Sequence, residues 1–507
     1  MSYECICRKK SVDQQVEAQT QSQFDVKYAI RTLVLFGLAI VTVMYVEIML
    51  TPVLPRLALD YNVTVGQTTL VLALYTVFGT AITPILGKLG DIYGKKRIMM
   101  YVLICYSGMV TITSFTPDFS ALLISRTFQG VGLAIIPLAF SIAREQFPRK
   151  MIPRAQALIS AMLVGGIGLG LSVGAFVANS FGWQTNYHIA APVVIILTVL
   201  IFYQVRESTF RNRRAKLDYA GSAMLGSSLA MIVLGLSEGP QWGWSSPQIL
   251  ALLGVGMLLL IPLMLFERKI KEPLLNFTQL RERNVLVSNI LAVTTGTAIL
   301  LTFTSMIYKL EDAKPSGYGH DILMSGLYLL PFAVVMLIVS YPVGILTSRV
   351  GVKPLLLVGS IIGALGSILL STETSSIQIP EYISVISLGL SFLIVSRQVL
   401  LVLSIKPADM GSMTSINQVF FNIGQSLGPA IAASILSTFA SAIVLSGHAH
   451  LFPTPEAFRY ISWLAAFLFI VSFVIALFVK EIIGRKIKDS NYDKEEVVKS
   501  QESVENT

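Results

Sequence analysis

Apolar stretches of about twenty residues alternate with short polar breaks along almost the whole chain, and about twenty helical residues cross a hydrocarbon layer about 30 Å thick. The stretches lack the alternation of apolar and polar residues that barrel strands show, and a span must satisfy its own backbone hydrogen bonds. We therefore expect helices. The polar breaks delimit fourteen predicted spans: 28–50, 67–88, 97–116, 119–141, 156–181, 187–205, 218–236, 247–267, 285–308, 321–346, 354–371, 381–404, 412–443 and 458–484.

Composition supports this interpretation. Of 507 residues, 54% are hydrophobic and 13% are charged, whereas soluble domains carry about 25% charged residues.

The first stretch begins near Tyr28 after a polar tail and has no small-residue cleavage site, so we expect a retained span instead of a signal peptide. Three cysteines, two of them close together, suggest neither a disulfide framework nor a metal site, and we expect no cofactor.

Basic residues gather in alternate loops, which gives the orientation. They are frequent in both tails and after the second, fourth, sixth and eighth spans, and rare on the other side of the predicted membrane. Because basic loops stay in the cytoplasm, we expect both termini there and the protein in the plasma membrane. The net charge of +9 is then a topology signal and not the mark of a nucleic-acid partner.

Two parts of the chain echo each other. Gly87 and Gly94 recur as Gly344 and Gly351 at a separation of 257, and Gly170 recurs 258 residues later. Parallel repeats of six helices are a transporter architecture. We predict an all-α membrane protein of two six-helix bundles and an inserted helix pair, with these segments: 1–27 N-terminal tail, 28–205 first bundle, 206–284 inserted hairpin with linkers, 285–484 second bundle, 485–507 C-terminal tail.

The loop after the second span combines glycines, one acid and basic residues: Gly87, Asp91, Gly94, Lys95 and Lys96. The glycines permit tight turns, the acid can accept charge-assisted hydrogen bonds, and the lysines suit a cytoplasmic surface. The pattern resembles the loop signature of the major facilitator superfamily, in which the acid pairs with a neighbouring helix and latches one conformation. A plain cytoplasmic turn is the alternative.

The second copy of this loop keeps both glycines but has Ser348 where the first has Asp91. We therefore expect the second latch to be weak or absent.

The fourth span carries Arg126, Gln129, Gly130 and Gly132, which resemble a motif of proton-coupled exporters. An arginine at mid-membrane costs about 2.5–3.5 kcal/mol on insertion scales, so packing alone does not explain it. The resemblance implies a role in proton coupling. The alternative is an arginine that extends to the outer surface.

Glu47, near the end of the first span, is the acid that we place well inside a span. Related fourteen-span drug exporters carry Asp near this point. The first span runs outward and the fourth runs inward, so Glu47 and Arg126 are expected at similar depth and together form the predicted proton-coupling pair. The alternative is an interfacial residue near the outer rim.

Gly166, Gly170 and Gly174 in the fifth span are spaced by four, which makes a smooth stripe for close helix packing. The stretch resembles the exporter motif of the fifth span, but Leu171 and Ala175 replace its Pro and its second Gly. Uptake therefore remains an alternative to export. The segment 236–247, with two tryptophans, resembles the outer loop of the inserted hairpin in fourteen-span drug:proton antiporters, and tryptophans there also anchor a membrane edge.

Further polar residues lie inside spans. Gln418, Asn422 and Gln425 share one face of the thirteenth span, and Arg397 lies in the twelfth. With Gln129 they are our candidates for lining a substrate cavity. Interhelical hydrogen bonding would also account for the polar face of the thirteenth span. An interfacial position would also account for Arg397.

Together these observations predict a secondary active transporter of the multidrug efflux type, a monomer that exchanges protons for small lipophilic or cationic compounds by alternating access. The alternative within transport is a proton-coupled symporter that takes up a small metabolite. An enzyme would need clustered carboxylates, histidines or metal ligands, and the sequence shows no such cluster. A channel would not need the internal repeat.

Overall fold

The computed structural model describes residues 26–63, 65–148, 151–208, 218–267, 277–312, 316–406, 409–445 and 448–481. Both predicted tails lie almost wholly outside these ranges. Thirteen helices within them are long and apolar enough to cross a membrane. The fourteenth long helix, Lys95–Thr113, has 19 residues and begins with three basic residues, which shorten its apolar run. The prediction of an almost entirely helical membrane protein is confirmed.

The helices follow the predicted spans closely. Those up to residue 208, called the first half, are α2 (Val26–Ile48), η1 (Thr51–Val53), α3 (Leu54–Asp60), α4 (Val65–Tyr93), α5 (Lys95–Thr113), α6 (Phe119–Gln129), η2 (Gly130–Ala134), α7 (Ile135–Gln146), α8 (Ile152–Phe181) and α9 (Trp183–Gln204). The inserted segment comprises α10 (Tyr219–Trp242), α11 (Pro247–Glu267) and the short α12 (Phe277–Leu280).

The second half comprises α13 (Arg283–Glu311), α14 (Ile322–Val350), α15 (Val352–Leu370), η4 (Ser376–Gln378), α16 (Ile379–Ser404), α17 (Met410–Thr438) and α18 (Pro455–Leu477). One predicted helix end is a strand instead. The apolar run to residue 443 does not continue as helix, because α17 ends at Thr438 and the chain forms a hairpin of β1 (Ala440–Leu445) and β2 (His448–Pro453). Ala440 pairs with Pro453 in antiparallel register.

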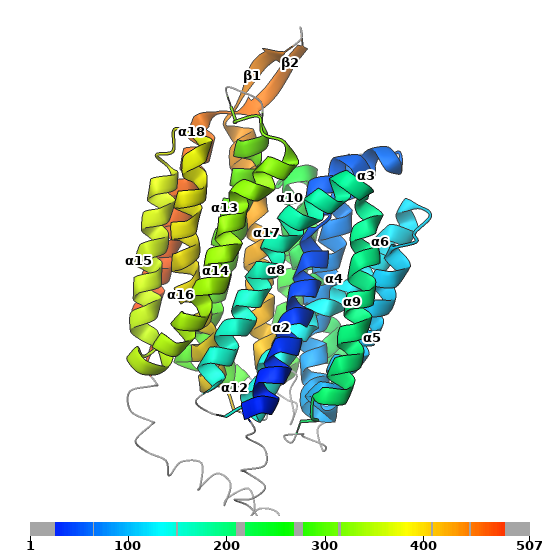
Figure 1. Cartoon of the computed structure of the whole chain (residues 1–507), viewed down its shortest axis with the longest axis vertical. Coiled ribbons are helices and arrows are strands. Elements are labelled where there is room, and N and C mark those ends of the chain that lie inside the picture. The colour runs from blue at the N-terminus through cyan, green and yellow to red at the C-terminus, as the bar shows by residue number, and fades with distance from the viewer. Residues whose placement is uncertain are drawn as a thin grey trace, which may run out of the picture.

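The long helices stand side by side, and the β-hairpin projects beyond one end of them (Figure 1). We call this end the hairpin face. The opposite end, where α2 begins and α18 ends, is the terminal face (Figure 1). Many large apolar side chains on the outward sides of α9, α11, α15 and α18 are exposed, as expected for surfaces that contact lipid.

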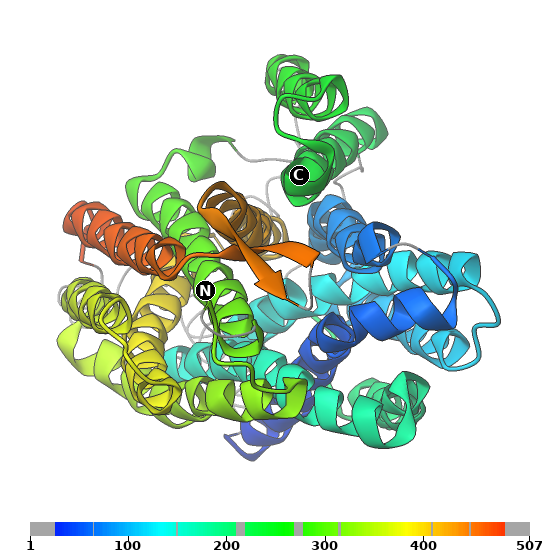
Figure 2. The ribbon, with the colours of Figure 1, turned by 90° about the horizontal axis from the view of Figure 1, so that it is seen from above.

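Seen from above, α2 to α9 lie on one side and α13 to α18 on the other, with α10 and α11 at the edge (Figure 2). The two halves meet along two seams, α4 with α17 and α8 with α14. Helix α10 packs against both helices of the first seam, while α11 is the least buried of the spanning helices. On the hairpin face, Trp244 Nε1 donates to Ser434 Oγ of α17 at 2.8 Å, so the inserted segment is bonded to the second half.

Small residues let α8 approach two helices at once. Gly166, Gly170 and Gly174 face α2, and a Cβ on Gly170 would lie 2.8 Å from the carbonyl oxygen of Tyr45. The opposite face of α8 meets α14, where a Cβ on Gly168 would lie 2.1 Å from the Ala333 Cβ. Helix α8 therefore packs closely against both halves.

The second half repeats the α2–α8 contact. Gly428 of α17 faces α13, and a Cβ there would lie 2.6 Å from the main-chain nitrogen of Leu301. Gly428 is the sequence counterpart of Gly170. The repeated glycine therefore serves the same close crossing in both halves.

Candidate functional site

Arg126 is fully buried near the end of α6 and is held by main-chain oxygens of α2. Its Nη1 donates to the Val46 carbonyl at 2.9 Å, and its Nη2 donates to the Glu47 carbonyl at 2.6 Å. The guanidinium also stacks over the Tyr75 ring, 4.6 Å from its centroid. These carbonyls lie near the end of α2, where the last helical carbonyls lack intrahelical partners. Arg126 therefore joins α6 to α2 and α4.

The side chain of Glu47 is only partly buried and lies close enough to Arg126 for Coulombic attraction. Within the described part of the chain, however, no carboxylate oxygen approaches the Arg126 guanidinium within 4.0 Å. The two predicted coupling residues are thus brought together, and their direct contact runs through the Glu47 main chain. The carboxylate remains able to bind a proton without breaking an ion pair.

Buried tyrosines surround this pair, and the sequence analysis did not single them out. Tyr75 and Tyr106 are fully buried and lie near enough to interact electrostatically with both Glu47 and Arg126. Their hydroxyl groups have no hydrogen-bond partner among the described residues. The only signal in the sequence was a hydroxyl-bearing aromatic residue inside an apolar span.

Gln129 is also fully buried and bonds within the first half. Its Oε1 accepts from Arg126 Nη1 at 3.0 Å, and its Nε2 donates to Thr113 Oγ1 at 2.5 Å. Immediately after Gln129 the helix tightens into the 3₁₀ segment η2. Here a Cβ on Gly130 would lie 2.4 Å from the Tyr75 carbonyl, so the glycine allows α4 to pack on η2. A 3₁₀ stretch inside a helix often marks a hinge.

At the terminal face, Asp91 binds the first turn of α17 in the other half. It accepts hydrogen bonds from the main-chain nitrogens of Gly411 and Ser412, both at 2.8 Å, and from Ser412 Oγ at 2.7 Å. Helix N-termini attract anions because their N–H groups are free and the helix dipole is positive there. At the same crossing a Cβ on Gly87 would lie 2.4 Å from the Gly411 oxygen. Asp91 thus ties the two halves together.

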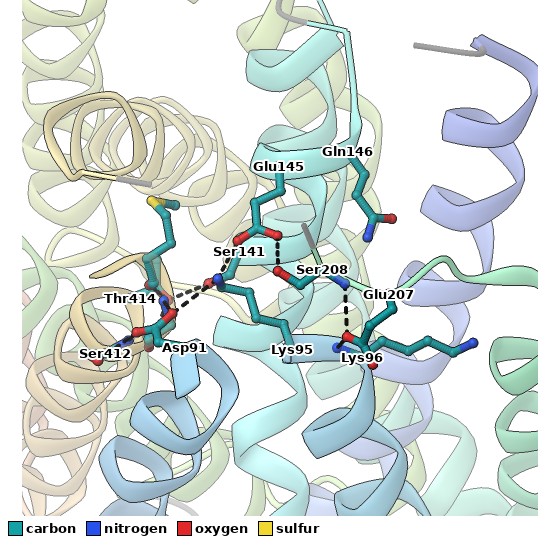
Figure 3. A network of polar contacts seen from close by, with 12 residues as sticks. Asp91, Lys95, Lys96, Ser141, Glu145, Gln146, Glu207, Ser208, Ser412 and Thr414 are labelled. Atoms are coloured by element: carbon teal, nitrogen blue, oxygen red, sulfur yellow. Dashed lines mark hydrogen bonds and ion pairs between the residues drawn. The ribbon is translucent and has the colours of Figure 1, made fainter. Parts of the chain in front are cut away.

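Asp91 belongs to a buried charge network (Figure 3). Lys95 Nζ lies 3.1 Å from Asp91 Oδ1 and also pairs with Glu145 of α7. Glu145 in turn accepts from Ser208 Oγ at 2.5 Å. These three ionisable groups carry a formal charge of −1 together, which the positive end of the α17 dipole offsets. The docked N-terminus of α17 therefore stabilises the negative charge of this network.

Lys96, by contrast, fastens helices within the first half. Glu207, after α9, accepts from Lys96 N at 3.1 Å, and Lys96 Nζ donates to the Phe202 carbonyl at 2.8 Å. Gly94 has a φ of 111°, which suits glycine at the break between α4 and α5.

The second loop copy repeats the internal fastening. Glu481, after α18, accepts from Val352 N and Lys353 N, at 3.1 and 2.9 Å. Lys353 Nζ donates to the Leu477 carbonyl at 2.8 Å. The loop thus has two separable roles, and the second copy keeps the one that joins helices within a half.

The remaining cavity candidates lie in the second half. Asn422 of α17 donates to Thr80 Oγ1 of α4 at 3.0 Å and accepts from Gln418 at 2.9 Å, so both lie at the seam between the halves. Gln425 is half-buried beside α13. Arg397 is buried within the second half and bonds Asn417 of α17.

One buried carboxylate was missed. Helix α10 extends to Trp242, beyond the predicted end at 236, and it therefore includes Glu238. The Glu238 residue is 1% exposed, and its Oε2 has no hydrogen-bond partner among the described residues. The sequence analysis placed it outside the span, in the segment 236–247 that resembles an outer loop.

Comparisons with known proteins agree with this architecture. The family model of the Major Facilitator Superfamily matches residues 36–376 and 285–501. Multidrug resistance protein 3 of Bacillus subtilis (strain 168) is 27% identical over 371 residues, covering 72% of this chain and 71% of the relative. The tetracenomycin C resistance and export protein of Streptomyces glaucescens is 22% identical over 357 residues, covering 69% of this chain and 65% of the relative.

The crystal structure of the human organic anion transporter MFSD10 (TETRAN) has the same fold, with a TM-score of 0.62 over 88% of this chain and 99% of that one, at 16% identity. The family match spans nearly all the described helices. The chain therefore belongs to the Major Facilitator Superfamily and is a multi-pass membrane transporter, not an enzyme.

Proposed function

We propose that this protein is a proton-coupled antiporter that exports small lipophilic or cationic compounds from the cytoplasm by alternating access. The observation that carries the proposal is the placement of Glu47, a carboxylate in a spanning helix, beside the buried guanidinium of Arg126. Ionisable residues inside a membrane are costly and mark substrate or proton pathways. The relatives named for multidrug resistance and for export support the direction of transport.

The geometry suggests how a proton and a substrate could use the site in turn. Burial favours the neutral form of a carboxyl group, and a nearby guanidinium favours the charged form. Arg126 is fixed to the main chain of α2, so small shifts of the Glu47 side chain change its distance from the guanidinium. A conformational change that moves the carboxylate toward or away from Arg126 would then take up or release a proton.

The basic loops of the sequence support an orientation with the terminal face in the cytoplasm. The contacts of Asp91 with α17 and of Gly87 with Gly411 then hold the structure closed on the cytoplasmic side. Breaking them would let the halves separate there and admit substrate. On this proposal the protein acts as a monomer in the plasma membrane, with both termini in the cytoplasm.

Proton-coupled uptake is the second candidate, and the fifth span favours it. Leu171 stands where the exporter motif has proline, and α8 runs unbroken from Ile152 to Phe181.

One assay separates the two candidates. Purified protein is reconstituted into liposomes that contain a pH-sensitive dye, and substrate is added outside. An antiporter releases lumenal protons as substrate enters, so the lumen becomes alkaline, whereas a symporter acidifies it. Glu47→Gln and protein-free liposomes are the controls for passive movement of the compound. Acidification that Glu47→Gln abolishes would establish symport and overturn our proposal.

A further inference from the structure

Arg397 is a buried charge with unused hydrogen-bonding capacity. The residue is 4% exposed, its Nη1 donates to Asn417 Oδ1 at 2.6 Å, and its guanidinium lies 5.3 Å from the Phe421 ring centroid. Its Nε has no partner, and no carboxylate oxygen lies within 4.0 Å of it, among the residues that the structure describes. Arginine stays charged in proteins, so this cation has no counter-ion in the part of the chain that the structure describes.

Arg126, which is also fully buried, likewise has no Nε partner and no carboxylate within 4.0 Å among the described residues, but its guanidinium makes more hydrogen bonds. Arg126 donates to two main-chain carbonyls and to Gln129, and it is attracted to Glu47. Three oxygen acceptors and a nearby carboxylate therefore stabilise its charge. Arg397 has one neutral amide oxygen and an aromatic face in place of these partners. Burying such a charge is unfavourable unless another group pairs with it.

The surroundings of Arg397 hold it in position. Asn417 Nδ2 donates to Asn289 Oδ1 at 2.8 Å, which directs the Asn417 oxygen toward the guanidinium. Ser288 Oγ donates to the Arg397 carbonyl at 3.2 Å. These polar residues come from α13, α16 and α17, and all of them are buried. The result is a buried polar cluster that carries one positive charge.

An apolar layer made by both halves lies one helical turn closer to the terminal face. Leu401 lies four residues after Arg397 in α16, and Met413 lies four residues before Asn417 in α17. Both pack in one cluster with Ile152 of α8. Ile152 belongs to the first half and the other two to the second. Separation of the halves at the terminal face would therefore remove Ile152 and uncover this layer, which lies one helical turn from the guanidinium.

We propose that Arg397 binds the oxyanion of an amphipathic substrate, so that lipophilic acids belong to the compounds this protein carries. The guanidinium can pair with a carboxylate through two parallel N–H donors, and Phe421, Leu401 and Met413 supply apolar surface for the body of the molecule. A carboxylate, a sulfonate and a phosphate ester share the chemistry that this site recognises. The inference rests on the proposed transport function, because access to Arg397 requires the halves to part.

The test uses three probes that share one aromatic body. They are 1-naphthaleneacetate, its neutral amide, and 1-naphthylmethyl-trimethylammonium as the cation. Binding of each to purified full-length protein is measured by equilibrium dialysis for the wild type, Arg397→Gln, Arg397→Lys and Arg459→Gln. Arg459 is exposed in α18, so its substitution is a matched control for the loss of one positive charge. Thermal unfolding and binding of the amide verify that each variant is folded.

We expect the wild type and Arg459→Gln to bind the acid at least about tenfold more tightly than the amide, since a charge-assisted pair replaces a neutral contact. Arg397→Gln should lose this preference and still bind the amide and the cation. Arg397→Lys should retain part of it, because lysine keeps the charge but not the two-donor fork.

Two results would overturn the proposal: an acid that binds no better than its amide, or a preference that survives in Arg397→Gln. If Arg397→Gln does not fold, an undiminished preference in Arg397→Lys contradicts the two-donor contact. Binding is measured at equilibrium without a proton gradient. The binding result can therefore be interpreted even if proton coupling fails, so the two hypotheses can fail separately.

Discussion

Replacing Asp91 with asparagine removes a negative charge from the contact between the halves and keeps the size of the side chain. The carboxylate accepts three hydrogen bonds from the first turn of α17, at 2.7 to 2.8 Å. Asparagine keeps one acceptor oxygen, and its amide group meets N–H donors where the other oxygen stood. At least one of these bonds to Gly411 or Ser412 is lost, together with the attraction of the charge to the helix N-terminus.

The loss can be estimated from these contacts. A hydrogen bond to a charged group contributes about 1.5–3 kcal/mol, and a charge at a helix end about 0.3–1 kcal/mol. The variant should therefore lose roughly 2–4 kcal/mol of the free energy that holds the terminal face closed. Since about 1.4 kcal/mol is a factor of ten, the ratio of open to closed molecules should rise about 30- to 700-fold.

Spin labels at Arg97 and Arg349 measure this ratio, because both side chains are exposed at the terminal face and belong to different halves. Double electron–electron resonance should show a long-distance population in Asp91→Asn that is small in the wild type. Turnover should fall more than substrate affinity, since the contact lies outside the candidate cavity.

Asp118→Asn is the matched control for this measurement. Asp118 also caps a helix, accepting from Ala121 N at 2.8 Å, but it does so within the first half. We expect the control to lose some stability without any change in the measured distance distribution. An unchanged distance distribution in Asp91→Asn, or unchanged turnover with lost binding, would refute our account of Asp91.

Two further predictions concern topology and packing. Ser245 and Ser437 are exposed on the hairpin face, and a cysteine at either position should react with an impermeant maleimide in intact cells. A cysteine at Thr278 should react only after permeabilisation. The opposite pattern would reverse the orientation. Gly168→Val should cost about 1–3 kcal/mol of stability through overpacking against Ala333, and it should lower the Tm. Gly254→Ala is the control and should not lower the Tm, because a Cβ at Gly254 meets nothing within 4 Å. Equal Tm values would contradict the α8–α14 contact.

The helices could be predicted from the sequence because their apolar runs have the length of a membrane span, and the loop of Asp91 because its glycines and charges form a local pattern. The end of α17 could not be predicted this way. Ala440–Leu445 is apolar enough to continue a helix, and only its pairing with His448–Pro453 makes it a strand. Non-local pairing leaves little trace in a local pattern.

The sequence suggested several residues of the candidate site, but neither the tyrosines around them nor the bonds that they make. Sequence spacing suggested that Glu47 and Arg126 share one depth, but the rotation of α2 decides that Arg126 meets main-chain carbonyls. The same limit applies to Gln129, which shares a face with Arg126 and bonds Thr113 of α5. Which side of a helix meets which neighbour depends on packing between distant segments.

Proton coupling at Glu47 is the central claim, and the variant Glu47→Gln tests it most directly. Glutamine keeps the size and hydrogen-bonding capacity of the side chain but cannot take up or release a proton. In proteoliposomes, two quantities should be measured for wild type and variant: exchange of labelled substrate at equal concentrations without a proton gradient, and accumulation against a concentration gradient driven by one. We predict that Glu47→Gln retains exchange and loses accumulation. A variant that accumulates substrate at the wild-type rate would show that protons are carried elsewhere and would contradict the account.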